Sequence, residues 1–380
     1  MAASGATIQE LMMAYVDIDK TALQRRFVGI SADEVRHSLG KDRLSSADFM
    51  NLISPSAAKF LPQMRKKAAV LKKMHFGKTV RIYAPLYVSS YCINNCLYCG
   101  FRTGNKSETR KRLSLEQIRK EAVAIKKLGI DSVLIVSGED PIFVSLGFLE
   151  TAVKELKRIF SYVSLEIYPL DVEGYRTLFK AGAHGLTIYQ ETYDRELYRH
   201  LHPSGPKRDY DNRLAAPARA AEAGFYNIGI GALLGLYDWR SEAVSIAAHA
   251  SWLMKKYWKS KMQFSFPRIT PIEGAFKVPA PVSEKELEQM MLAFRLSFPE
   301  CDMVLSTREN CEFRNRAVLH SVNMMSAGSS VVPGGYASPR EGKLGQFSRR
   351  DARTVKEVAK DLKKLGLEAV FKDWDKCMGL

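Results

Sequence analysis

The chain has 380 residues, of which 46% are hydrophobic, and this composition is sufficient for a sizeable globular core. Its apolar stretches are too short to span a bilayer and its first thirty residues lack a secretory signal pattern, so we expect a cytoplasmic protein without a membrane segment. The formal net charge is +16. We attribute it to solvated basic helix faces, for example at Lys106–Arg112, and consider an acidic protein partner the second interpretation. We do not expect nucleic acid as a partner, because no nucleic-acid-binding motif accompanies the charge.

Residues 1–78 are predicted to form an N-terminal helical extension. Ala32–Leu39 and Ser46–Ile53 have the apolar spacing of short amphipathic helices, and Leu61–Phe76 has that of a longer one. Gly77 follows the longer helix as a stop signal.

From residue 79 the pattern changes to alternating strands and helices. Strands that alternate with helices form a parallel sheet, and eight such units close into a barrel. We therefore predict an α/β fold, a (β/α)8 TIM-type barrel over residues 79–326. The expected strands are 79–88, 132–136, 163–167, 185–189, 226–230, 262–266, 303–305 and 321–325. The clearest helical patterns are 119–127, 149–160, 212–223, 243–258 and 286–298, and capping boxes are expected at Ser114 with Gln117 and at Ser283 with Glu286.

The first expected strand is followed directly by a loop with three cysteines, Cys92, Cys96 and Cys99. Electron-carrier clusters are held by four cysteines, whereas the spacing C-x3-C-x2-C supplies three. Three ligands leave one iron of a cubane cluster open to a small molecule, so the loop predicts an iron–sulfur centre at which chemistry occurs. Zinc completed by a distant histidine is the less favoured alternative, and we do not expect a disulfide framework.

Polar residues end the second and third strands at the same rim of the barrel. The second strand ends in Ser137, Gly138 and Glu139. A carboxylate there can accept hydrogen bonds from an ammonium group, and the glycine lets a ligand approach the backbone. Glu166 interrupts the third strand, where a carboxylate is costly unless it faces the open end or forms a salt bridge with a neighbouring strand.

The segment after the barrel, residues 327–380, is predicted to be a loop and helix that close it. Residues 327–339 are rich in glycine, serine and proline, and we expect them to cross the barrel mouth. A helix is expected over Asp351–Leu365, followed by a short apolar run at 368–371.

The cysteine spacing, with the aromatic Tyr98 before the last cysteine, resembles the signature of the radical S-adenosylmethionine (SAM) superfamily. The resemblance implies a 4Fe–4S cluster on Cys92, Cys96 and Cys99, with SAM chelating the open iron. It also implies an external one-electron reductant of the flavodoxin or ferredoxin type, which enables the cluster to split SAM into methionine and a 5′-deoxyadenosyl radical.

The same resemblance implies roles for other rim residues. Ser137–Glu139 matches the motif that receives the methionyl amino group of SAM, and Glu166 would bind the ribose hydroxyls. Ile230 and Gly231 belong to a glycine-spaced strand end that would lie along the adenine, although close strand–helix packing also explains the glycines. Tyr98 would pack beside the adenine, a role compatible with filling the loop's own small core.

Several further stretches resemble the aromatic amino acid lyases of this superfamily, and most of all the tyrosine lyases of thiamine thiazole biosynthesis. They are 85–90, 189–193, 265–268, 305–309, 333–337 and 372–375. This resemblance implies cleavage of the Cα–Cβ bond of L-tyrosine to 2-iminoacetate and p-cresol, and association with a thiazole synthase.

Three alternatives stay open. A tryptophan lyase is possible because indole and phenol pockets are hard to separate from sequence. A tyrosine lyase of hydrogenase maturation goes on to make carbon monoxide and cyanide. It carries a second cluster on a C-terminal cysteine triad, where this chain has Cys377 alone. A radical SAM enzyme that modifies RNA would explain the positive charge.

An amino acid substrate needs a cationic clamp for its carboxylate, and the planar fork of arginine suits it best. Arg308, with Ser306 beside it, is our first choice, and Arg268 is the second. Either arginine has the alternative of a structural ion pair, for example with Glu309 or Glu191.

The run after the fourth strand supplies candidate polar contacts to SAM or substrate, namely Gln190, Glu191 and Tyr193. Their roles cannot be divided from sequence. His184, His200 and His202 are candidate proton shuttles or, as we prefer, ordinary surface or loop histidines.

Overall fold

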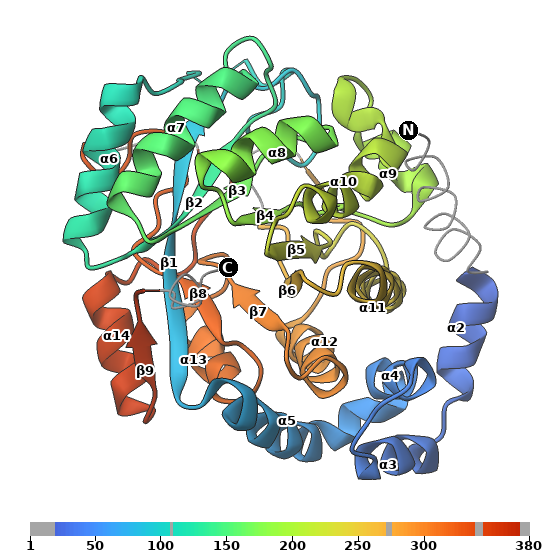
Figure 1. The fold of residues 1–380 in the computed structure, drawn as a ribbon. Coiled ribbons are helices and arrows are strands. Elements are labelled where there is room, and N and C mark those ends of the chain that lie inside the picture. The colour runs from blue at the N-terminus through green and yellow to red at the C-terminus, as the bar shows by residue number, and fades with distance from the viewer. Residues whose placement is uncertain (1–19, 107–108, 271–275, 339–344, 373–380) are drawn as a thin grey trace.

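The computed structural model describes residues 20–106, 109–270, 276–338 and 345–372 (Figure 1). Within them nine parallel strands form one sheet, and eight of these close into a barrel because β1 (Thr79–Ser89) pairs with both β2 and β8. The other barrel strands are β2 (Ser132–Ser137), β3 (Tyr162–Glu166), β4 (Gly185–Thr187), β5 (Asn227–Gly231), β6 (Lys261–Ser265), β7 (Asp302–Leu305) and β8 (Met324–Ser326). The predicted (β/α)8 barrel is confirmed, and every predicted strand overlaps an observed one.

Helices surround the strands (Figure 1). They are α6 (Leu115–Lys127), α7 (Leu146–Ile159), α8 (Val172–Ala181), α9 (Arg195–Leu201), α10 (Tyr210–Glu222), α11 (Trp239–Lys256), α12 (Glu284–Ser297) and α13 (Cys311–His320). Both predicted capping boxes are present at the starts of α6 and α12. α8, α9 and α13 were not among the clearest helical patterns, and their first turns are capped by the side chains of Asp171, Asp194 and Asn310.

The N-terminal helices lie outside the barrel. They are α2 (Lys20–Gly29), α3 (Ala32–Gly40), α4 (Ser46–Ile53) and α5 (Leu61–Phe76), with a 3-10 turn at Pro55–Phe60. The rings of Phe49 and Phe294 meet edge to face at 5.1 Å, and Gln289 Nε2 donates to the Leu52 carbonyl at 3.0 Å. These contacts fix α4 against α12, while the boundary at residues 78 and 79 stays a prediction.

The C-terminal part contains α14 (Val355–Lys364) and β9 (Glu368–Val370), which lie beside β1 in Figure 1. β9 was expected only as an apolar run, and it pairs with the start of β1 at Thr79. The helix predicted from Asp351 begins at Val355, because Thr354 caps it and accepts a bond from Glu357 N. Pro339, the 373–375 part of the motif at 372–375, and Cys377 lie outside the described residues.

The interior of the barrel combines large side chains, such as Tyr83, Leu134 and Met324, with small and polar ones. A small cavity of about 20 Å³ lies between them, bordered also by Ser164, Gly229 and Gln263. Thr187 and Tyr189 border both this cavity and a second one at the rim, so the two are neighbours.

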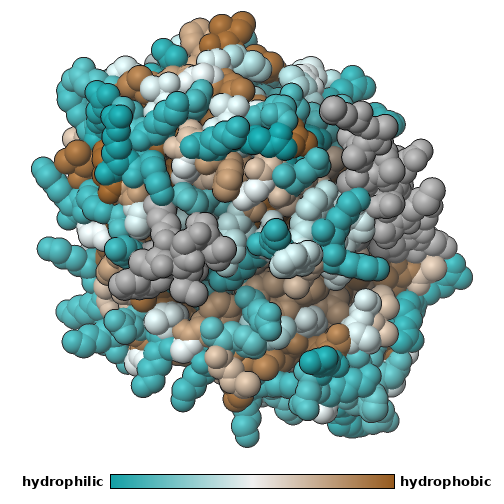
Figure 2. All heavy atoms as spheres, viewed as in Figure 1, coloured by the Kyte–Doolittle hydropathy of each residue, from teal (hydrophilic) through white to brown (hydrophobic). Residues whose placement is uncertain are grey.

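The face of the molecule in Figure 2 is mostly hydrophilic, with apolar side chains gathered in small groups. No helix of the described residues combines the length and the apolar character needed to cross a membrane.

Candidate active site

The rim cavity lies where β1 to β4 end, and its volume is about 620 Å³ with its open mouth included. Its wall contains eight of the residues singled out from the sequence. They are Cys92, Cys96, Cys99, Ser137, Gly138, Glu139, Glu166 and Glu191. Because the carboxyl ends of parallel strands meet at one edge, residues far apart in the chain converge here.

The cysteine loop is held by backbone bonds to the segment after α9. Asn95 N donates to Ser204 O at 3.2 Å, and Leu97 N donates to Leu201 O at 3.1 Å. From the other side Arg110 donates to the carbonyl oxygens of Ser90 and Phe101 at 2.6 and 2.5 Å. The assignment of Lys106–Arg112 to a solvated helix face is therefore wrong for Arg110, which braces the loop, and none of the described residues of that run is helical.

The residues of the cavity fit a cluster with a small polar ligand beside it. Burial raises the pKa of Cys96 to about 11 and that of Cys99 to about 12, so their thiolates form only where a positive charge compensates, as iron does. Ser137 Oγ is buried and has no hydrogen-bond partner among the described residues. Within the described residues, no three His, Cys, Asp or Glu side chains are arranged to hold a single metal ion.

Asn94 is a central residue of the site that sequence reasoning missed. Its Nδ2 donates to Glu139 Oε2 at 2.6 Å and lies 3.8 Å from Cys92 Sγ. Its Oδ1 accepts from Lys207 N at 2.8 Å. One buried amide therefore ties the cysteine loop, the end of β2 and the loop before α10 together, and it orients the Glu139 carboxylate.

Gly138 is required by the approach of the cysteine loop. A Cβ at this position would lie 2.3 Å from Tyr91 O and 3.0 Å from Cys92 Cβ. We expected the glycine to admit a ligand, and the structure shows that it admits the loop itself against the end of β2.

Glu166 has no salt bridge among the described residues, and it borders the rim cavity. Of the two arrangements in which a carboxylate is tolerated on this strand, Glu166 therefore has the one that faces the open end. Burial raises its pKa to about 7, and the nearby Arg308 opposes this rise. Arg308 itself has no salt bridge within the described chain, and its guanidinium carbon lies 3.6 Å from the centre of the Phe347 ring. Ser306 Oγ accepts from Arg308 N at 3.4 Å.

Arg268 has the structural role that the sequence left open. Its Nε donates to Glu309 Oε1 at 2.8 Å, Nη2 pairs with the other carboxylate oxygen, and Nη1 donates to Val282 O at 2.7 Å. This geometry occupies the fork of Arg268 and favours Arg308 as the carboxylate ligand.

Glu191 lies at the cavity but is shared by two cations that were not predicted. Lys207 Nζ lies 2.6 Å and Arg213 Nη2 3.3 Å from the same oxygen, Oε1. The attraction of Lys207 and Arg213 outweighs burial and lowers the pKa of Glu191. Two positive charges thus face one negative charge beside the cysteines, which suits an anionic ligand.

Gln190 and Tyr193 do not border the rim cavity, and neither do Arg268, Ser306 and Arg308, so the contacts of these residues with SAM or substrate stay predictions. Side chains alternate along a strand, so Tyr189 and Glu191 point inward and Gln190 points outward, where its Nε2 donates to Tyr210 O at 3.3 Å. Glu191 has φ +71°, which turns the chain and sends Tyr193 toward α11. There the Tyr193 hydroxyl lies 2.9 Å from His249 Nδ1.

The buried His249 predicts that the folded protein loses stability as the pH falls. Burial lowers its pKa to about 3, whereas an unfolded histidine has a pKa near 6.5, so only the unfolded chain gains this proton as the pH falls from about 6.5 toward 3. The free energy of unfolding should fall with decreasing pH, by up to about 1.4 kcal/mol per pH unit from this group. In urea unfolding at several pH values, H249Q should show a shallower slope than the wild type, whereas H200Q, at an exposed position, should not. Equal slopes for H249Q and the wild type would contradict this.

Tyr98 packs within the loop's own surroundings, the role that we considered compatible with adenine binding. Its hydroxyl lies 2.7 Å from Nε2 of His202, whose Nδ1 lies 2.7 Å from Tyr198 O. Both ring nitrogens of His202 are therefore engaged, in keeping with an ordinary structural histidine. Ile230 packs in the main core and Gly231 lies against Ser265 O, where a Cβ would be 2.4 Å away. The adenine contacts of these residues stay predictions.

Comparisons with known proteins agree with this site. A radical SAM superfamily model matches residues 86–245, and a model of the biotin and thiamin synthesis associated domain matches residues 265–368. The 2-iminoacetate synthase of Salmonella typhimurium is 40% identical over 94% of both chains, and that of Escherichia coli is 38% identical over 95% of this chain and 96% of its own. The crystal structure of HydG, a maturase of the FeFe-hydrogenase, matches with a TM-score of 0.89 at 30% identity, over 95% of this chain and 82% of that one.

The barrel, the cysteine loop and the similarity to these proteins together define a radical SAM enzyme, with a 4Fe–4S cluster and SAM as its cofactors. Identity near 40% over almost the whole length narrows the assignment further. The chain belongs to the 2-iminoacetate synthase family of that superfamily.

Proposed function

We propose that the chain is a tyrosine lyase, which breaks the Cα–Cβ bond of L-tyrosine and releases 2-iminoacetate and p-cresol for the thiazole of thiamine. Its identity of 40% with the 2-iminoacetate synthase of Salmonella typhimurium, over 94% of both chains, carries this proposal. When bound, the cluster and SAM supply a 5′-deoxyadenosyl radical that takes a hydrogen atom from the substrate. The side chains of the protein bind, orient and shield the reactants.

On the cofactor side, Cys92, Cys96 and Cys99 hold the cluster. Glu139, oriented by Asn94, accepts hydrogen bonds from the ammonium group of SAM. The two cations around Glu191 supply the positive charge that the carboxylate of SAM requires.

On the substrate side, Arg308 binds the carboxylate of tyrosine with Ser306 beside it. Arg308 has no salt bridge within the described residues, whereas Arg268 is occupied by Glu309. The phenol ring then points toward the barrel interior at Thr187 and Tyr189, where side chains must move to admit it because the inner cavity has a volume of about 20 Å³.

The product 2-iminoacetate is an imine that water hydrolyses. We therefore propose that a thiazole synthase receives it directly in the cytoplasm, and that a flavodoxin- or ferredoxin-type protein reduces the cluster. Co-elution of the chain with such a synthase in anaerobic size-exclusion chromatography tests the first of these partners.

Anaerobic reconstitution with iron and sulfide, followed by SAM, a reductant and each aromatic amino acid in turn, tests the reaction. Formation of p-cresol with tyrosine alone supports the proposal, and indole-derived products from tryptophan, or no product from a reducible cluster, overturn it. The match to HydG keeps a hydrogenase-maturation lyase as the second candidate. Carbon monoxide and cyanide in the same reaction would favour that candidate.

A further inference from the structure

Residues 345–354, which we name the C-terminal strap, run along the end of β7. Gln346 N donates to Val331 O at 3.3 Å. Arg350 N and Asp351 N both donate to the carbonyl oxygen of Thr307, at 2.8 and 3.3 Å. The strap is thereby attached to the residue that precedes Arg308.

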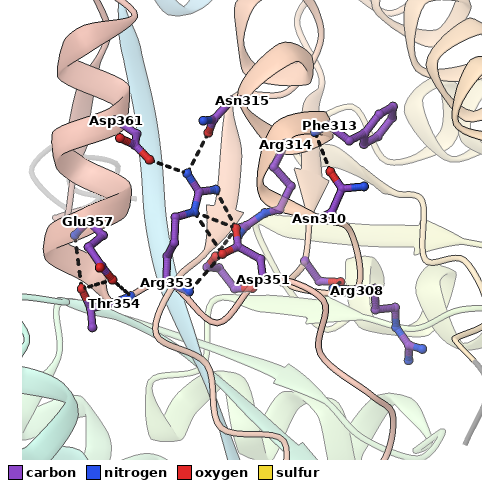
Figure 3. A network of polar contacts seen from close by, with 12 residues as sticks. Arg308, Asn310, Phe313, Arg314, Asn315, Asp351, Arg353, Thr354, Glu357 and Asp361 are labelled. Atoms are coloured by element: carbon purple, nitrogen blue, oxygen red, sulfur yellow. Dashed lines mark hydrogen bonds and ion pairs between the residues drawn. The ribbon is translucent and has the colours of Figure 1, made fainter.

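The far end of the strap is anchored by a network of ion pairs (Figure 3). Asp351 is buried between two guanidinium groups: it pairs with Arg314, which is fully buried, and with Arg353 Nη2 at 2.6 Å. Arg353 also donates to Asn315 Oδ1 and Asp361 Oδ2, both at 2.9 Å. Because each buried charge has a partner, the network holds the strap on α13 and α14 in one position.

The near end of the strap reaches the active site. The Phe347 ring lies under the Arg308 guanidinium at 3.6 Å, within the range of a cation–π contact. Gln346 borders the rim cavity, and its Oε1 accepts from the Tyr87 hydroxyl at 2.7 Å. Stacking uses the face of the guanidinium and leaves its N–H edge available for a carboxylate.

We propose that Phe347 is a positioning residue for substrate binding, which holds Arg308 in the orientation that receives the carboxylate of the amino acid. The inference rests on the proposed function, since it takes Arg308 as the carboxylate ligand. A long, flexible arginine loses conformational entropy when it binds a carboxylate, and a fixed aromatic face meets part of that cost before the substrate arrives.

Tyrosine binding to the reconstituted enzyme with SAM, without reductant, tests the proposal. F347L removes the ring and should raise the Kd for tyrosine by about two- to twelve-fold, the cost of immobilising one long side chain on binding. F347Y keeps the ring and should bind within about two-fold of the wild type. The Kd for SAM and the thermal midpoint should be unchanged in both variants. F143L, at an exposed ring that stacks on Tyr91, is the matched control and should bind tyrosine as the wild type does.

Wild-type affinity in F347L would overturn the inference, and so would an F347Y variant as weak as F347L. Failure of the proposed function would appear differently, as a wild-type enzyme that makes no p-cresol. In that case the comparison is made with the amino acid that the wild type does bind, because the carboxylate is common to all of them.

Discussion

C99A is expected to lose the cluster and with it all lyase activity. Two thiolates cannot hold three corners of a cubane, and the described residues contain no further cysteine at the rim cavity. Losing only an outer partner of a metal ligand costs about 10- to 100-fold, so the loss of a ligand should exceed about 100-fold. Iron content, visible absorption after anaerobic reconstitution and p-cresol formation measure the effect.

C311A provides the control, because Cys311 is an exposed cysteine at the start of α13 and does not border the cavity. It should retain both iron and activity. If the thermal midpoint of C99A is close to that of the wild type, the C99A protein still folds. A C99A enzyme with a full complement of iron and normal turnover would refute the assignment of the three-cysteine loop.

The barrel could be predicted because its signals are local. Each strand is a short run of apolar residues that favour strands, and it lies between two helices. Because both faces of such a strand are buried, nearly all of its residues are apolar. The helices with the weakest apolar pattern are short or carry polar residues on most of their length, as in Arg195–Leu201. For these helices the capping residue indicates the start of the helix better than the apolar periodicity does. β9 was missed as a strand because three residues gain strand geometry only by pairing with β1.

The candidate site divides in the same way. The cysteine spacing and the carboxylates Glu139 and Glu166 could be found because they lie on one loop or at the ends of predicted strands. Asn94 could not, since its partners lie 45 and 113 residues away in the chain. Lys207 lies within the short 3-10 turn Pro206–Arg208 and Arg213 lies on a helix, and neither position differs in sequence from a solvated one.

Phe347 and Tyr193 illustrate the limits of positional reasoning. Phe347 belongs to no helix or strand, so no periodicity predicts what its ring touches. Tyr193 would face inward if the strand alternation continued, but the positive φ of Glu191 redirects the chain. Both outcomes depend on tertiary contacts that a sequence pattern does not contain.

R308A is expected to impair turnover of tyrosine far more than binding of SAM. A charge-assisted hydrogen bond is worth about 1.5–3 kcal/mol, so the loss of even one bond of the guanidinium fork should lower kcat/KM about 10- to 150-fold, and the loss of both should lower it further. R308K keeps the charge but not the fork and should recover only part of this loss. Removing Arg308 also takes away the positive charge that opposes the raised pKa of Glu166, so the comparison should be made above pH 8, where the Glu166 carboxyl is more fully ionised in both enzymes.

R316A is the matched control for R308A, because Arg316 is an exposed arginine on α13 whose guanidinium already pairs with Glu284 at 2.9 Å. Its kcat/KM should equal that of the wild type. If R308A kept a wild-type KM for tyrosine while R268K lost affinity, the carboxylate ligand would be Arg268, and the Arg268–Glu309 pair would have to open when substrate binds. A charge left behind on a buried Glu309 makes that opening costly, which is the physical reason to expect the opposite result.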